Sequence, residues 1–166
     1  MEENITSEAQ LEFNNENAKR LIYQVAEFSA SSLDNLLEIA KTTAENIEET
    51  GNSQQEAGEI LAFKQKIKGL EENLADLKMR IKADLYSIQD SLKKAEISAN
   101  EIAEPNEKAD EEIEKLQKLI ILGNINKTKI KNKIWQVGEE ISGIEKKMFT
   151  LARQKGLSIT EEENID

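Results

Sequence analysis

Histidine and cysteine are both missing from this sequence of 166 residues. Without histidine, a catalytic triad, a histidine phosphorelay and a histidine–carboxylate zinc site all lose their central residue. Without cysteine, a disulfide framework and a thiolate metal site are excluded as well. We therefore expect neither an enzyme nor a resident metal or cofactor. A chain without cysteine suits the cytoplasm, which we take as the expected location.

Turn-forming and aromatic residues are scarce. The chain has one proline and seven glycines, aromatic residues make up 4% of it, and charged residues reach 33%. This balance suits long amphipathic helices and lacks the turn residues that a β-fold needs. No glycine-rich phosphate loop is present, and no apolar run approaches the roughly 18–20 residues of a membrane span. The first four residues lack a basic region followed by an apolar one, so we expect no signal peptide.

Positive charge is in short supply, because 33 acidic residues oppose 22 basic ones and give a net charge of −11. This balance argues against direct binding of nucleic acid, since phosphate contacts need lysine and arginine. The charge is uneven along the chain. Residues 1–50 hold 11 acids and 3 bases, net −8, whereas residues 105–155 hold 8 acids and 11 bases, net +3. We therefore expect the first segment to attract the last one electrostatically.

The strongest pattern in the chain is a heptad seam between residues 60 and 92. Its apolar residues recur at steps of three and four, at Ile60, Phe63, Ile67, Leu70, Leu74, Leu77, Ile81, Leu85, Ile88 and Leu92. A seam of this length predicts one side of a helix that lies along another helix. Residues 11–47 carry two adjacent apolar rows, which favours a helix packed against two neighbours. A third heptad runs from Ile113 to Leu151, and its layers at Gly123 and Lys127 lack an apolar residue.

Three helices follow from these patterns, over residues 7–50, 55–104 and 106–155. Ser7 with Gln10 three positions later predicts a capping box at the first start. Pro105 ends the second helix at Glu104 and suits the first turn of the third. Helices of matched length joined by short turns predict an all-α, elongated antiparallel three-helix bundle, a coiled-coil rod.

This bundle is expected to be a single unit over residues 7–155. Residues 1–6 are expected to be a flexible N-terminus, and residues 156–166 an acidic disordered tail. The alternative is a fold of four helices with a break near Gly123. The segment from Gly123 to Asn126, together with Thr128, has poor helix propensity.

One basic patch suggests a site. Four lysines at alternate positions, 127, 129, 131 and 133, precede Trp135, the single tryptophan. One interpretation is structural: the stem of Lys127 packs on the seam, and the other lysines are solvated or pair with the acidic first segment. The functional interpretation is a weak, basic notch where an acidic or helical partner docks. Its candidate partner-binding residues are Gly123, Lys127, Lys131 and Trp135.

The densest carboxylate cluster outside the tail, Glu111-Glu112, is interpreted as solvated charge at a helix start. With no catalytic constellation, we expect a structural or protein–protein interaction protein, a helical adaptor or assembly component. Its partner would be another protein or further copies of itself. The alternative is an acidic inhibitor or chaperone that occupies a basic surface of a nucleic-acid-binding enzyme or a client protein. The acidic face for that role comprises Glu27, Asp34, Glu38 and Glu45.

Overall fold

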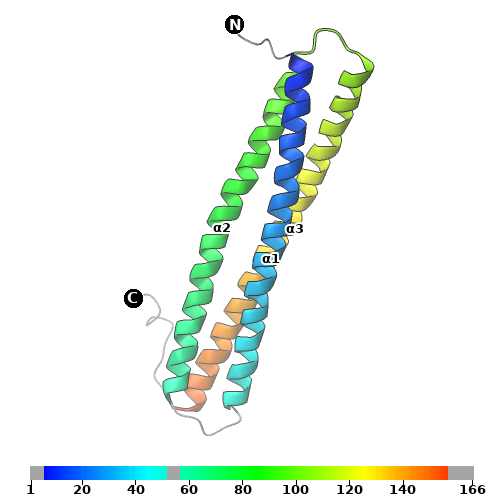
Figure 1. The fold of residues 1–166 in the computed structure, drawn as a ribbon. Coiled ribbons are helices and arrows are strands. Elements are labelled where there is room, and N and C mark those ends of the chain that lie inside the picture. Colours follow the sequence, from blue (N-terminus) through cyan, green and yellow to red (C-terminus); the bar gives the residue numbers. More distant parts are fainter. Residues whose placement is uncertain (1–5, 52–56, 157–166) are drawn as a thin grey trace. The chain divides into compact units, whose positions relative to one another are not determined.

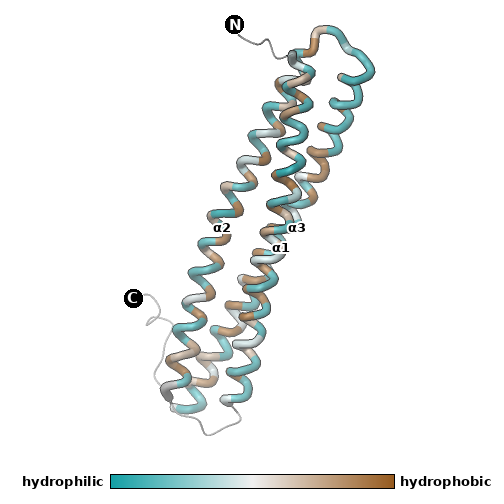
Figure 2. Tube along the Cα trace, viewed as in Figure 1, coloured by the Kyte–Doolittle hydropathy of each residue, from teal (hydrophilic) through white to brown (hydrophobic). Residues whose placement is uncertain are grey.

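The computed structural model describes residues 6–51 and 57–156, which form three long α-helices. Their bounds are Ser7–Gly51 for α1, Ala57–Asn100 for α2 and Glu107–Gln154 for α3 (Figure 1). These described residues contain no strand, so the predicted all-α fold of three packed helices is confirmed. Apolar residues recur along every helix with polar ones between them, as Figure 2 shows.

The described residues group into two compact units. The first unit lies within Met1–Ala30 and Met79–Lys131, and the second within Ser31–Lys78 and Asn132–Asp166. Each helix therefore contributes one segment to each unit. The prediction of a single helical unit over residues 7–155 stays a prediction.

Helix directions within each unit follow from the side chains that meet. In the first unit, Asn17 bonds to Ser91 and the Phe28 ring lies under Arg80, 3.9 Å from ring centroid to guanidinium carbon, so α1 and α2 are antiparallel. In the second unit, Asp34 meets Lys133 and Glu48 meets Lys147, so α1 and α3 are parallel. The antiparallel arrangement predicted from short connections is therefore observed in both units.

The seam between residues 60 and 92 forms the inner face of α2, as predicted. Six of its residues are buried, and the other four are partly buried. The buried ones are Ile60, Ile67, Leu70, Leu74, Ile81 and Ile88. The heptad spacing therefore identifies the packing face of this helix correctly.

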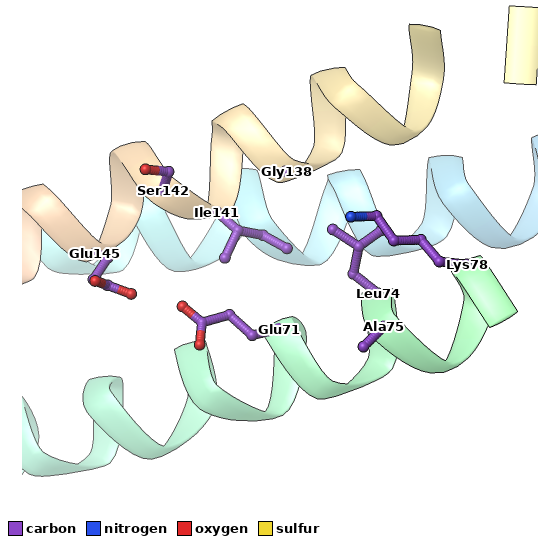
Figure 3. Close-up of a pocket in the computed structure, with 8 residues that line it drawn as sticks. All are labelled: Glu71, Leu74, Ala75, Lys78, Gly138, Ile141, Ser142 and Glu145. Carbon is purple, nitrogen blue, oxygen red and sulfur yellow. The ribbon is translucent and has the colours of Figure 1, made fainter. Parts of the chain in front are cut away.

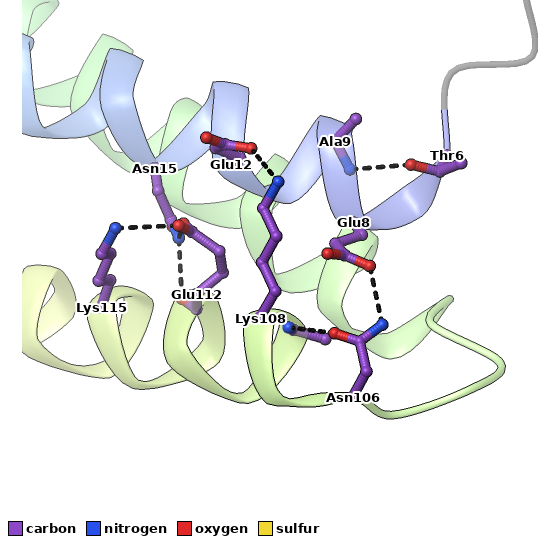
Figure 4. Close-up of polar contacts among 10 residues, drawn as sticks. Thr6, Glu8, Ala9, Glu12, Asn15, Asn106, Lys108, Glu112 and Lys115 are labelled. Atoms are coloured by element: carbon purple, nitrogen blue, oxygen red, sulfur yellow. Dashed lines mark hydrogen bonds and ion pairs between the residues drawn. The ribbon is translucent and has the colours of Figure 1, made fainter.

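Helix α1 starts at Ser7 as predicted, whereas α2 starts two residues and α3 one residue later than predicted. Thr6, not Ser7, caps α1, because its Oγ1 accepts a hydrogen bond of 3.1 Å from the Ala9 amide. Asn106 caps α3 in the same way, with its Oδ1 2.8 Å from the Ala109 amide nitrogen (Figure 4). Pro105 thus precedes the cap, although the sequence placed it inside the first turn. Short side chains with an oxygen are the preferred caps in both cases.

The end of α2 lies four residues before the predicted one. The chain leaves the helix after Asn100, and tight hydrogen bonds close its last turn, from the Glu101 amide to the Ser98 carbonyl and from the Ile102 amide to the Ala99 carbonyl. Ile102 packs against the cluster formed by Leu11, Ala95 and Leu116. The proline restricts only the residue before it, and burial of Ile102 favours the earlier turn.

The alternative of four helices is wrong, because α3 continues without a break from Glu107 to Gln154. A Cβ atom placed on Gly123 would lie 3.6 Å from Leu92 Cδ1 and 3.7 Å from Ile22 Cδ1. A methyl group at this position would therefore meet both side chains at ordinary contact distance, and α3 passes through the glycine without a break. Residues 1–5 of the N-terminus that was predicted to be flexible, residues 157–166 of the tail that was predicted to be disordered, and the connection at 52–56 lie outside the described residues.

Candidate functional site

The predicted partner-binding residues are divided between the two units. Gly123, Lys127 and Lys131 belong to the first unit, whereas Trp135 belongs to the second. Both lysines are exposed, so Lys127 does not lie on the seam where the sequence placed it. Asn126 takes that layer instead and is partly buried. The steps from Leu119 through Gly123 and Asn126 to Ile130 keep the heptad spacing, which turns Lys127 toward solvent.

The acidic face of α1 is exposed at all four predicted residues, Glu27, Asp34, Glu38 and Glu45. Part of it is used within the chain. Lys133 pairs with Asp34, Lys108 with Glu12 at 3.4 Å and Lys147 with Glu48 at 2.7 Å. All three pairs join acidic α1 to basic α3, as the uneven charge of the sequence predicts. Each is worth little on its own because both partners are largely solvated.

Trp135 is 68% exposed, the largest aromatic surface on the described part of α3. It lies one helical turn before Gly138, and Gly138, Ser142 and Glu145 continue along the same flank of the helix at spacings of three and four. The sequence suggested that this tryptophan packs at the edge of a bundle or binds a partner. Its exposure leaves the ring available for contact.

A groove separates α2 from α3 in the second unit (Figure 3). Its volume is about 220 Å³. Its walls come from eight residues, Glu71, Leu74, Ala75 and Lys78 of α2 and Gly138, Ile141, Ser142 and Glu145 of α3. Small side chains on both helices leave this space: a Cβ on Gly138 would still be 3.8 Å from the nearest atom, Leu74 Cδ2.

The carboxyl groups of Glu71 and Glu145 face each other at one end of this groove, and the side chain of Lys78 extends from the other end to lie beside Leu74 (Figure 3). A hydrogen bond to Glu145 raises the pKa of Glu71 to about 7, and desolvation and the negative charge of Glu145 add to the rise. The pair therefore holds a shared proton over a pH range in which isolated glutamates are ionised. Sequence analysis missed both residues, because neither lies on a seam.

A second polar cluster is buried in the first unit (Figure 4). Asn15 and Glu112 are only 2% and 4% exposed. The Asn15 amide donates to the Glu112 carbonyl at 2.8 Å and to its carboxylate at 3.0 Å. Lys115 donates to the same carboxylate at 3.0 Å. Glu112 was predicted to be solvated, which is wrong, because its side chain points between α3 and α1.

The charge state of Glu112 follows from these contacts. Burial alone would raise its pKa, but the hydrogen bonds from Asn15 and Lys115 hold the pKa below the ordinary value. The carboxylate is therefore ionised in the folded protein. A signal for this cluster was present in the sequence: Asn15 falls between Leu11 and Ala18 at seam spacing, where a polar residue must find a buried partner.

The described residues offer few other chemical options. No group of three or more acidic side chains among them could hold a metal ion, and no described helix has the length and apolar character that crossing a membrane requires. What the groove provides is an apolar floor with a carboxyl pair, a combination suited to binding a proton or an organic cation. Comparison of the chain with protein-family models, curated proteins and solved structures finds no match.

Proposed function

We propose that this protein is a non-enzymatic protein–protein interaction protein, a helical adaptor or assembly component, and that α3 of the second unit carries its contact surface. The observation behind the proposal is the 68% exposed side chain of Trp135 on the helix flank that continues into the groove. Tryptophan is enriched at the energetic centres of protein interfaces, and most folded chains bury much of it.

The groove supports the same role. An exposed aromatic residue beside a hollow with an apolar floor gives a partner both a flat ring to cover and a space to fill. Single exposed apolar residues are common on protein surfaces, so the tryptophan alone would be weak support. Its position one turn from Gly138 is what joins the two features into one surface.

A second candidate function is that of an acidic inhibitor or chaperone. Glu27, Glu38 and Glu45 are exposed along α1 and could meet a basic surface. Asp34 and Glu48 already pair with lysines of α3, so part of the acidic face is neutralised within the chain. The first proposal is therefore preferred. Salt separates the two, because binding through the acidic face should weaken steeply as ionic strength rises.

Capture of partners from the native host tests the proposal, with wild type compared to Trp135→Ala. Tyr86→Ala is the matched control, because Tyr86 is 70% exposed but lies in the first unit. We expect the wild type and Tyr86→Ala to retain the same partner at moderate salt and Trp135→Ala to lose it. Sedimentation of the three proteins covers the case in which the partner is another copy of the chain. A wild type that captures nothing and sediments as a monomer would overturn the proposal.

A further inference from the structure

We propose that the groove between α2 and α3 of the second unit is a socket for an arginine side chain of the partner protein. This inference rests on the proposed function and names the chemistry that the contact surface recognises. It stands on three features of the groove: its size, its apolar floor and the pair of carboxyl groups at one end.

The floor of the groove fits an aliphatic stem. Leu74 and Ile141 are buried beneath it, and Ala75 and Gly138 keep its walls low. The volume of about 220 Å³ leaves room for one long side chain. A whole partner helix is too large for this space, whereas a single extended side chain fits.

The charges of the groove favour one orientation of that side chain. Glu71 and Glu145 face each other at one end, and Lys78 extends from the other end with its ammonium drawn beside Leu74 (Figure 3). A guanidinium group is planar and carries donors on several edges, so it can bond to both carboxylates at once. A lysine side chain would present a point charge and could not bridge the two carboxylates as well.

The two carboxyl groups of the groove, on Glu71 and Glu145, repel each other when both are ionised. Their hydrogen bond and mutual repulsion raise the pKa of Glu71 to about 7. Two further charged groups of α2 belong to this surrounding. The negative charge of Glu72 also raises the pKa of Glu71, and Lys78 lines the groove. A guanidinium that enters must displace the shared proton. Binding should therefore strengthen as the pH rises from 6 to 8, because the proton leaves more easily.

A titration of the full chain with butylguanidinium tests this inference, since that probe carries an arginine-like stem and head. The readout is the amide NMR signal of Gly138, which lines the groove. Gly123 of the first unit is the internal reference, since it does not line the groove. We expect a saturable shift at Gly138 alone, tighter binding at pH 8 than at pH 6, and at least tenfold weaker binding of butylammonium.

Variants separate socket binding from general attraction to an acidic protein. Glu71→Gln with Glu145→Gln removes the carboxylates, and we expect the apparent dissociation constant of butylguanidinium to rise at least tenfold. Glu72→Gln is the matched control, because Glu72 adjoins Glu71 but does not line the groove. Equal binding by the double variant and by the Glu72→Gln control, or a shift that never saturates, would overturn the socket.

The same double variant separates this inference from the proposed function. If the wild type captures a partner and the double variant captures it equally well, the socket is wrong while the interaction role stands. If the wild type captures no partner, the proposed function fails, and the butylguanidinium titration still decides whether the groove binds a guanidinium. Thermal melting of each variant shows that it is folded.

Discussion

The two units use the same three helices but fill their cores differently. Among the described residues, the first unit buries five polar side chains, Asn15, Ser29, Ser91, Ser98 and Glu112. The second buries two, Thr43 and Thr50, and each donates a 2.8 Å hydrogen bond to a carbonyl of its own helix. Three of the polar side chains in the first core, Asn15, Ser91 and Glu112, therefore bond to another helix, whereas neither threonine of the second core does so through these bonds.

This difference suggests a division of physical roles. Large apolar residues from all three helices fill the second unit, among them Leu33, Ile67 and Met148. Burial of such side chains supplies most of the free energy of folding. A buried asparagine–glutamate contact contributes less net stability, but it disfavours other registers, in which these groups would lack partners. The first unit thus specifies how α1 and α3 align, and the second supplies more of the stability.

The largest expected effect is in the second unit, at Leu74, which is 7% exposed at the centre of the seam. Leu74→Asp places a carboxylate in an apolar core and should lower the free energy of unfolding by about 4 kcal/mol or more. Leu61→Asp is the control, because Leu61 lies on the same helix and is 52% exposed. Denaturant unfolding followed by circular dichroism measures both. If Leu74→Asp unfolds at the same denaturant concentration as wild type, our assignment of the core is wrong.

The polar core of the first unit should respond to Glu112→Ala. The change removes the charge-assisted hydrogen bonds from Asn15 and Lys115, so we expect a loss of about 2 kcal/mol. Glu111→Ala should stay within about 0.5 kcal/mol, because Glu111 is exposed. Hydrogen exchange locates the loss, which should be largest in the first unit. Equal effects of the two substitutions would mean that the buried network contributes nothing.

The apolar periodicity of the sequence predicts the helices and their buried faces. It does not predict contacts between particular residues of different helices. The seam from 60 to 92 was found because apolar spacing is a local signal. The contact between Asn15 and Glu112 joins residues 97 positions apart, and no local pattern encodes it. The position of Lys127 was predicted wrongly for a related reason: where Gly123 and Asn126 replace apolar residues, hydrophobic spacing no longer defines the register. The groove depends on which flanks of two helices meet, and spacing within one helix does not fix that.

The two units should also respond to pH in opposite senses. The raised pKa of Glu71 means that its contribution to stability is complete below its unfolded value of 4.5 and is lost as the pH rises through about 7. The lowered pKa of Glu112 gives the reverse, a contribution present above 4.5 and lost as the pH falls through the folded value. Acid therefore weakens the first unit, while a rise through neutral pH weakens the second.

Glu71→Gln isolates the second of these effects. The variant should melt about 1–3 °C above wild type at pH 8, because it removes a repulsion that solvent partly screens. At pH 5 the two proteins should melt together, since the wild-type pair already holds its proton. Glu72→Gln should show a smaller change of the same sign, because the charge of Glu72 is the weakest of the causes that raise the pKa of Glu71. Melting curves at both pH values measure the difference, and a variant that gains as much at pH 5 as at pH 8 would contradict the shared proton.

The smallest expected effects come from replacing glycines by alanine. They separate the stability gained from new side-chain contacts from the stability gained from higher helix propensity. Gly123→Ala in the first unit and Gly143→Ala in the second should each gain about 1 kcal/mol from propensity. The new methyl at 123 would also touch Leu92 and Ile22 at ordinary contact distance, whereas at 143 it meets nothing within 4 Å. Gly123→Ala should therefore gain more, by a few tenths of a kcal/mol per new contact.

Gly156→Ala is a control with the opposite expected sign. The backbone φ of Gly156 is 74°, which disfavours any side chain, so this substitution should lower the stability slightly. Matched denaturant curves measure all three substitutions. A gain at 123 no larger than at 143 would show that the first unit is loosely packed around this glycine. If Gly123→Ala gains stability and still captures the partner, the absent side chain at 123 serves no binding role. The contact surface would then lie with Trp135 and the groove of the second unit.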